Sequence, residues 1–369
     1  MKKRSWGWRL VAIVAGVALA LGLVACGDDD DTAADTATTG GGGTALNLAY
    51  VTTATHPYGL AVADFAKKVN ATGELNITTQ ASYPQAEPQL LADVRSGVVD
   101  MATISSAIFD TAGINAFQAL QAPFLITNYP LALEVEGGDI GKAMIADATT
   151  EAGDLVVLAI HEGGLRKPFG KKKLTSLAAF KGTTIRAPQS KVLADGLSAL
   201  GANADPLPLP DVYQALQTGT VDGVEANLPL IYLSKWYEVA KYITGNVNLW
   251  PFPTVLVVNK AKYDSLTSDQ QAALTTGAAG ITDFSIGIFT APGSTIPQDL
   301  VNCGAEFVSS SDADKAALEK AGATAVSQLA PESQDFVTQI QAVKEATPPP
   351  SAPPPFPTTK TGACEPPPG

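Results

Sequence analysis

Residues 183–188 (TTIRAP) and 211–225 (DVYQALQTGTVDGVE) contain the pattern that decides the fold. Four of the first five residues of the first run have β-branched or apolar side chains, as a strand does, and residues 191–200 follow with apolar side chains at helical spacing. Residues 212–217 again have the spacing of a helix, and a short strand at 221–224 comes after it. Strands that alternate with helices predict an α/β unit with a parallel or mixed sheet.

The same alternation continues on both sides of this region. Before it, the sequence predicts strands at 46–51, 75–79, 98–104 and 156–160 and helices at 59–69 and 85–96. After it, the sequence predicts helices at 228–242, 268–289 and 312–346, the last capped by Asp312 and broken near Pro331, and strands at 254–258 and 306–309. We therefore expect an α/β protein of two lobes with a cleft between them, several chain crossings and a long helix that spans the lobes.

The composition excludes some classes of protein. The 369 residues are 46% hydrophobic, which is too apolar for global disorder, and the net charge of −12 argues against a nucleic-acid binder. With two histidines and three cysteines, a zinc site of Cys and His ligands is close to excluded. No G-x-S-x-G motif is present, and neither His56 nor His161 has a nucleophile close to it in sequence. We expect both histidines to be polar residues of loops or of the pocket, and we expect neither catalysis nor a cofactor or metal.

The N-terminus has the features of an export signal. Lys2, Lys3 and Arg4 precede an uncharged apolar run at 11–25, which is short for a spanning helix. The run ends in Leu-Val-Ala before Cys26, a sequence that resembles the lipobox of bacterial lipoproteins. It predicts cleavage after residue 25, lipidation of Cys26 and a protein tethered outside the cytoplasmic membrane. The alternatives are an ordinary secretory signal or an uncleaved anchor.

Cleavage at Cys26 changes the charge and leaves two other thiols. The mature chain has 20 cations and 36 anions, a net charge of −16. Residues 26–44 are acidic and rich in Gly, so we expect a flexible linker. Residues 347–369 carry ten prolines and predict an extended tail. In an oxidising compartment Cys303 and Cys364 could form a disulfide that fastens this tail to the second lobe; two free thiols or intermolecular pairing are the alternatives.

Cations gather in one part of this acidic chain. Eight of the 20 lie between His161 and Lys191, against a single acid, Glu162. Arg166 follows a predicted strand and Arg186 lies within one. A guanidinium at a strand end can bind a ligand carboxylate through two parallel N–H groups, or it can form a buried structural ion pair.

The order of the motifs resembles a known family, the DctP-type solute-binding proteins of TRAP transporters. The similarity extends over about residues 46–344, and its pieces occur in the expected order. They are GLRKPF at 164–169, FKGTTIRAP at 180–188, YQALQTGTVDG at 213–223, KWYEVAKY at 235–242, VRSGVVDMA at 94–102 and APFL at 122–125. The YQALQTGTVDG run is the most specific of them.

The resemblance implies a function and some of the residues that carry it. Members of the family close two α/β lobes on an organic acid, usually a carboxylate, and deliver it to a membrane permease. Arg186 matches the arginine that forms the main salt bridge to the ligand, and Arg166 matches an arginine that supports it. The family often has an Asn after the VDG-x-E run, where this chain has Ala226. Either Asn227 or Glu225 supplies that contact after a small shift, or the ligand is less polar there.

Further lining candidates come from the ends of predicted strands and from aromatic residues. They are Tyr58, Glu87, Ser105, Tyr213 and Trp236. For each of them, packing in the core or on the surface is the alternative. We expect Asp100 and Asp222 to shape turns.

These observations combine into one hypothesis. We expect a signal peptide at 1–25, a linker at 26–44, lobe I mainly at 45–160, lobe II mainly at 161–260, helices crossing the lobes at 261–346 and a tail at 347–369. The protein would bind a carboxylate outside the cytoplasmic membrane and deliver it to the small and large subunits of a TRAP permease. A lipoprotein that senses a ligand and signals to a membrane receptor is the alternative, and a hydrolase or lyase on the same scaffold is a third possibility.

Overall fold

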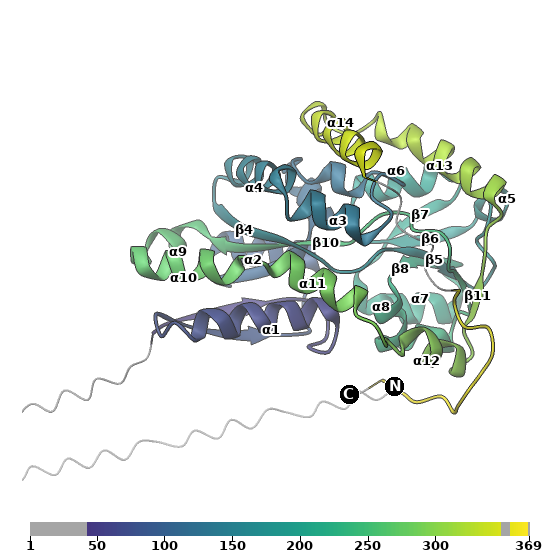
Figure 1. Ribbon diagram of the computed structural model, residues 1–369, viewed down its shortest axis with the longest axis horizontal. Coiled ribbons are helices and arrows are strands. Elements are labelled where there is room, and N and C mark those ends of the chain that lie inside the picture. The colour runs from purple at the N-terminus through teal and green to yellow at the C-terminus, as the bar shows by residue number, and fades with distance from the viewer. Residues whose placement is uncertain (1–42, 348–354, 368–369) are drawn as a thin grey trace, which may run out of the picture. The chain divides into compact units, whose positions relative to one another are not determined.

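A computed structural model describes residues 43–347 and 355–367 of the chain. The expected signal peptide, Cys26 and nearly all of the expected linker lie outside these residues. Two mixed β-sheets, each covered by helices, form two lobes (Figure 1). The expectation of two α/β lobes is confirmed.

The sheet of lobe I has the strand order β2-β1-β3-β10-β4. Its strands are β1 (Thr44–Ala49), β2 (Leu75–Gln80), β3 (Met101–Ser105), β4 (Leu155–Glu162) and β10 (Pro253–Asn259). The helices of this lobe are α1 (Pro57–Asn70), α2 (Glu87–Ser96), α3 (Tyr129–Glu136), α4 (Asp139–Ala152), α9 (Lys260–Asp264), α10 (Ser268–Ala278) and α11 (Ile281–Thr290), with 3-10 helices η1 (Ser106–Ala112) and η2 (Gln118–Gln121). Strand β1 runs parallel to both of its neighbours, whereas β10 runs antiparallel to both of its own.

The sheet of lobe II has the order β11-β9-β5-β8-β6-β7. Its strands are β5 (Lys167–Gly170), β6 (Thr184–Ala187), β7 (Asn203–Pro206), β8 (Gly223–Ala226), β9 (Tyr242–Thr244) and β11 (Glu306–Val308). Its helices are α5 (Leu177–Phe180), α6 (Lys191–Ala199), α7 (Val212–Thr218), α8 (Leu228–Leu233) and α12 (Ile296–Asn302), with 3-10 helices η3 (Leu209–Asp211) and η4 (Trp236–Glu238).

Strand β10 contributes side chains to the hydrophobic cores on both faces of the lobe I sheet. All seven of its residues are buried. Val255 and Val257 contact the core on the side of α2, α3 and α4, whereas Leu256 and Val258 contact the core on the side of α1 and α10. Successive side chains of a strand point to opposite faces, so a strand with helices on both faces has to be apolar throughout.

Two antiparallel segments connect the lobes. One leads from β4 to β5 and the other from β9 to β10. The amide of Gly163 donates to the carbonyl of Phe252 at 2.8 Å, and the amide of Arg166 donates to the carbonyl of Trp250 at 2.8 Å. We call residues 162–166 and 250–253 the hinge ribbon.

Several expected elements differ in the structure. The expected helix at 268–289 is two helices, α10 and α11, because Gly280 adopts a φ of 74°. Residues 268–290 are long and apolar enough to cross a membrane by length and composition, but α11 packs on α1 and β4. The expected helix at 228–242 stops at Leu233, because Lys235 has a φ of 55°.

Two other expectations are corrected. Ser311, not Asp312, caps α13 (Asp312–Val326), since its side chain accepts the amide of Asp314. The strand expected at 254–258 in lobe II is β10, which lies in the lobe I sheet. The break at Pro331 is present, where α14 (Pro331–Ala346) begins.

The C-terminal elements contact both lobes. Helix α13 packs on α5 and α6 of lobe II, and α14 packs on α3, α4 and η2 of lobe I (Figure 1). Cys303, which follows α12, forms a disulfide with Cys364. Phe356 stacks on Phe307 of β11, with ring centroids 4.4 Å apart. The described part of the tail is therefore fixed to lobe II.

Candidate functional site

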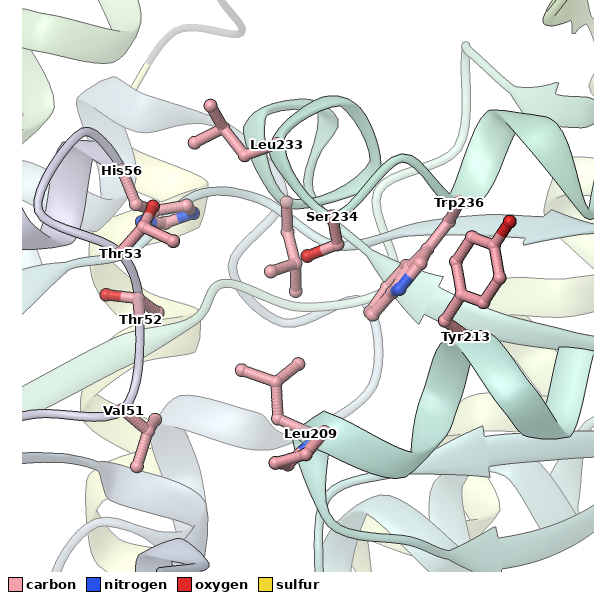
Figure 2. A pocket seen from close by; sticks show the side chains of 11 residues that line it. Val51, Thr52, Thr53, His56, Leu209, Tyr213, Leu233, Ser234 and Trp236 are labelled. Atoms are coloured by element: carbon pink, nitrogen blue, oxygen red, sulfur yellow. The ribbon is translucent and has the colours of Figure 1, made fainter. Parts of the chain in front are cut away.

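Two cavities lie between the lobes. The larger has a volume of about 270 Å³. The loop that follows β1, from Val51 to His56, forms one wall, and Leu209, Tyr213 and the α8–η4 region form the other (Figure 2). The cavity therefore has one wall from each lobe.

The smaller cavity has a volume of about 40 Å³ and holds the charged residues. Arg186 of lobe II and Glu87 of lobe I both line it. Val51, Leu209 and Pro210 line both cavities, so the two are neighbouring parts of one interlobe cleft.

Strand β6 places Arg186 at the smaller cavity. Its Nε and Nη2 atoms donate to the carbonyl of Leu207 at 2.9 and 2.7 Å. No described residue accepts a hydrogen bond from the other three of its five N–H groups. Burial lowers the pKa of Arg186 to about 10, and the nearby Glu225 opposes this shift. Arg186 is therefore a cation at physiological pH, with donors left for a ligand.

Glu87 begins α2 and is held by a neighbouring turn. Its Oε1 accepts the amide of Ser105 at 2.8 Å. Burial raises the pKa of Glu87, whereas the Ser105 amide, Arg186 and Arg166 lower it. The Ser105 hydroxyl caps η1 by accepting the amide of Ala107. Ser105 therefore positions Glu87 and lies outside the residues that line the two cavities.

Arg166 and Glu225 form a buried ion pair beside the hinge ribbon. The Nε and Nη2 atoms of Arg166 both donate to the carboxylate of Glu225, and each side chain is 1% exposed. Trp250 donates to the same carboxylate at 3.2 Å, and the guanidinium lies 4.5 Å from the ring centre of Phe252. Neither charged residue lines a cavity. Arg166 and Glu225, which were both expected at the ligand, contact each other, and the buried Nη1 of Arg166 has no hydrogen-bond partner among the described residues.

Asn227 joins three parts of the molecule. Its Oδ1 accepts the amide of Leu230 and thereby caps α8, and its Nδ2 donates to the carbonyl of Gly163 at 2.7 Å. His56 caps α1 by accepting the amide of Tyr58 at Nδ1, so Nε2 carries the proton and faces the Asn227 Oδ1 at 3.4 Å. This pair links the lobes directly. Burial lowers the pKa of His56 to about 4.

The aromatic candidates divide into two groups. Tyr213 and Trp236 line the larger cavity (Figure 2). Tyr58 instead lies fully buried in lobe I, where its hydroxyl donates to the carbonyl of Thr103. Its ring packs edge-on against His161, at 5.3 Å between centroids. Tyr58 is therefore a core residue outside both cavities.

The sequence reasoning missed part of the cleft. Leu209 and Pro210 line both cavities, and the run 206–210 (PLPLP) was a signal for them, because such a run ends a strand in an irregular loop. It also missed Glu162, whose Oε1 accepts the amides of Gly164 at 2.5 Å and Phe252 at 3.0 Å in the hinge ribbon.

A second buried carboxyl group lies beside Glu162. Burial and the charge of Glu162 raise the pKa of Glu136 well above its ordinary value. Within residues 43–347 and 355–367, no group of three or more His, Cys, Asp or Glu side chains is placed to hold a metal ion.

Comparisons with known proteins show which proteins this chain is similar to. The sequence profile described as "Bacterial extracellular solute-binding protein, family 7" (DctP) matches residues 48–332. A C4-dicarboxylate-binding periplasmic protein of Rhodobacter capsulatus is 28% identical over 307 residues, which are 82% of this chain and 90% of that protein.

Solved structures give the same result. A TRAP periplasmic solute-binding protein of Xanthobacter autotrophicus Py2 with bound β-D-galacturonate is 26% identical, with a TM-score of 0.74 over 80% of this chain and 99% of the other. A sugar acid binding protein of Advenella mimigardefordensis in complex with galactonate is 26% identical, with a TM-score of 0.76 over 83% of this chain and 99% of the other.

Proposed function

The chain belongs to family 7 of the bacterial extracellular solute-binding proteins, the DctP family, and from this we propose that Arg186 binds the carboxylate of a small organic acid in the interlobe cleft. The family consists of binding proteins rather than enzymes. The protein acts outside the cytoplasmic membrane, as the solute-binding component of a TRAP-type transporter. Relatives that bind C4-dicarboxylate, galacturonate and galactonate support an acid as the ligand.

One observation carries the assignment of Arg186. It is a buried cation at an interlobe cavity, and three of its N–H groups have no acceptor among the described residues. A carboxylate accepts two parallel N–H groups from such a fork. Glu87 faces the same cavity, and burial raises its pKa. Tyr213 and Trp236 would contact the rest of the ligand.

Closure of the lobes follows from the same arrangement. A ligand held by both walls of the cleft stabilises the closed form, because it binds that form more tightly than the open one. Closure also removes water from the ion pair and so strengthens it. The hinge ribbon and the His56–Asn227 pair connect the lobes during this movement.

Delivery to the transporter is the second part of the proposal. Partner proteins would be the small and large subunits of a TRAP permease, and lipidated Cys26 would hold the binding protein at the membrane beside them. The Cys26→Ser variant should leave the membrane fraction of cells; retention of all the protein there would contradict the anchor.

Ligand-induced thermal stabilisation tests the role of Arg186. The protein, expressed in soluble form from the residue after Cys26 onward, is screened with D-galacturonate, D-galactonate, succinate and phenylacetate. An acid present at about 100 times its Kd stabilises the protein by about 2.7 kcal/mol. We expect Arg186→Gln to abolish the rise in Tm and Arg186→Lys to reduce it, because an ammonium lacks the planar fork.

The matched control changes an arginine remote from the cleft. Arg95, at the end of α2, pairs with Asp154 at 2.8 Å and lines neither cavity, so Arg95→Gln should keep the rise in Tm. An unchanged rise with Arg186→Gln would show that the carboxylate is bound elsewhere.

A further inference from the structure

The two parts of the cleft differ in what they can hold. The smaller cavity, at about 40 Å³, offers much less space to a ligand than the larger one, at about 270 Å³. The remainder of any ligand bound to Arg186 must therefore extend into the larger cavity, past Val51, Leu209 and Pro210, which line both.

The wall of the larger cavity is mostly apolar. Seven of its 11 lining residues are Val, Leu, Pro, Tyr or Trp, and the others are Thr52, Thr53, His56 and Ser234. The described lining contains no Lys, Arg, Asp or Glu. A second carboxylate in this cavity would find no Lys or Arg among the lining residues, and an ion taken from water without a partner is strongly disfavoured.

Some of the polar groups of this wall already form hydrogen bonds within the protein. Both ring nitrogens of His56 face protein groups, and its pKa of about 4 keeps it neutral at physiological pH. The hydroxyl of Thr53 bonds to that of Thr55 at 3.2 Å. The Thr52 hydroxyl is buried without a partner among the described residues, and the Ser234 hydroxyl points toward the cavity in Figure 2. These two hydroxyls and the indole N–H of Trp236, which has no acceptor among the described residues, can satisfy a few polar substituents, whereas a sugar acid has more hydroxyls to satisfy.

We propose that the ligand is a monocarboxylate with a largely apolar body, either an aryl group or a branched alkyl chain. Its carboxylate lies at Arg186 and its body lies against Leu209, Leu233 and Trp236. Dicarboxylates and polyhydroxy acids bind less well, because their polar groups lack partners in the larger cavity. This inference rests on the proposed role of Arg186.

Calorimetric titration of the soluble protein tests the ligand class. We expect phenylacetate to bind about tenfold or more tightly than succinate or D-galacturonate, because a buried polar group without a partner costs at least as much as a lost apolar contact. Tighter binding of succinate or D-galacturonate, still lost in Arg186→Gln, would overturn the ligand class and leave the proposed function intact. Failure of all three acids to bind would overturn both.

A polar substitution in the wall tests where the body lies. Leu209 is half-buried and lines both cavities, so Leu209→Asn would place an amide against the apolar body. We expect phenylacetate binding to weaken about tenfold. Leu60→Asn, on the exposed side of α1 and outside both cavities, is the control and should bind as the parent does.

The substituted protein must stay folded for this comparison. Thermal melts of both variants without ligand report on folding, and Leu233→Asn, also half-buried in the wall, replaces Leu209→Asn if that variant unfolds. Equal affinity of the folded wall variant and the parent for phenylacetate would overturn the placement of the ligand body.

Discussion

Arg166 and Arg186 look alike in sequence and differ in the structure. Both belong to the basic region between His161 and Lys191. Arg166 lies between strands β4 and β5, and Arg186 lies in strand β6. Arg166 pairs with Glu225, which lies 59 residues further along the chain, whereas Arg186 keeps donors at the cleft. Of the alternatives expected for an arginine, Arg166 forms the structural ion pair, and Arg186 has N–H groups left for the proposed ligand. Sequence could not assign them, because the partner of Arg166 is brought to it by the pairing of β5 with β8.

The remaining site candidates show the same limit at the residue scale. Glu87, Tyr213 and Trp236 were predicted from strand ends and aromatic character, and all three line the cleft. Asn227 was predicted from the family resemblance and Tyr58 from a strand end, but a helix cap and a packed core use their polar atoms. Local sequence shows that a polar atom is available. It does not show which distant backbone group forms a hydrogen bond with that atom.

His56 makes the stability of the protein depend on pH. Its pKa falls from an ordinary value of 6.5 to about 4 because it is buried. Between these values the unfolded chain binds a proton and the folded chain does not, so acid favours unfolding. The free energy of unfolding should fall by about 3 kcal/mol from this group between pH 7 and pH 4.

Urea unfolding at a series of pH values measures this dependence. In the His56→Gln variant the free energy of unfolding should fall less steeply between pH 6.5 and 4. Part of the fall should remain, because His161 is also buried and has a lowered pKa. A fall as steep in the variant as in the parent would assign the dependence to other groups.

At the scale of the elements, most of the long periodic segments were predicted, although the 14-residue helix α4 was missed, and several of the short ones were missed as well. Helices α1, α2 and α6 and strands β1, β2 and β10 carry enough apolar residues to show their period. Strands β5, β7 and β9 have three or four residues each, which is too short for a period, and they form because neighbouring strands supply hydrogen bonds. The break between α10 and α11 was missed because a single Gly in an apolar run is compatible with a helix.

Gly280 and Gly287 allow a matched test of that break. Gly280 has a φ of 74°, whereas Gly287 lies within α11, and an added Cβ would touch nothing at either position. Gly280→Ala should lower the free energy of unfolding by about 1 kcal/mol, because a left-handed conformation is strained for Ala. Gly287→Ala should raise it by about 0.5–1 kcal/mol, because Ala favours a helix interior.

Urea unfolding distinguishes the two substitutions. If Gly280→Ala stabilised the protein as much as Gly287→Ala, the two helices would be one continuous helix in solution.

For the whole molecule, the similarity of ordered motifs predicted the fold and the family, and the expected Cys303–Cys364 disulfide, which fastens the tail to lobe II, is confirmed. No motif predicted the other contacts of the C-terminal region. Residues 333–347 lie beyond the part matched by the family profile, and the described tail follows them. Its contacts are specific: Tyr232 donates to the carbonyl of Glu365 at 2.9 Å, and the side chain of Asn302 accepts the amide of Thr361 at 3.0 Å. Such contacts depend on the surface of lobe II, which tail composition does not encode.

The disulfide should contribute to the stability of the whole chain. It joins residues 61 apart, and a loop of this size stabilises a folded protein by about 2–4 kcal/mol through restriction of the unfolded chain. The double variant Cys303→Ser, Cys364→Ser should lose this amount in urea unfolding. The parent protein measured with a reducing agent is the control, and it should match the variant. Equal stability of variant and oxidised parent would show that the disulfide does not restrict the unfolded chain.

The same disulfide closes a covalent ring that contains α13, on lobe II, and α14, on lobe I. Proteolysis of one peptide bond between residues 304 and 363 opens that ring but releases no fragment, because each new end remains joined to the body through the main chain or through Cys303. Outside the cytoplasm, where peptidases meet the protein and thiols stay oxidised, a single cut would therefore leave α14 attached to the molecule.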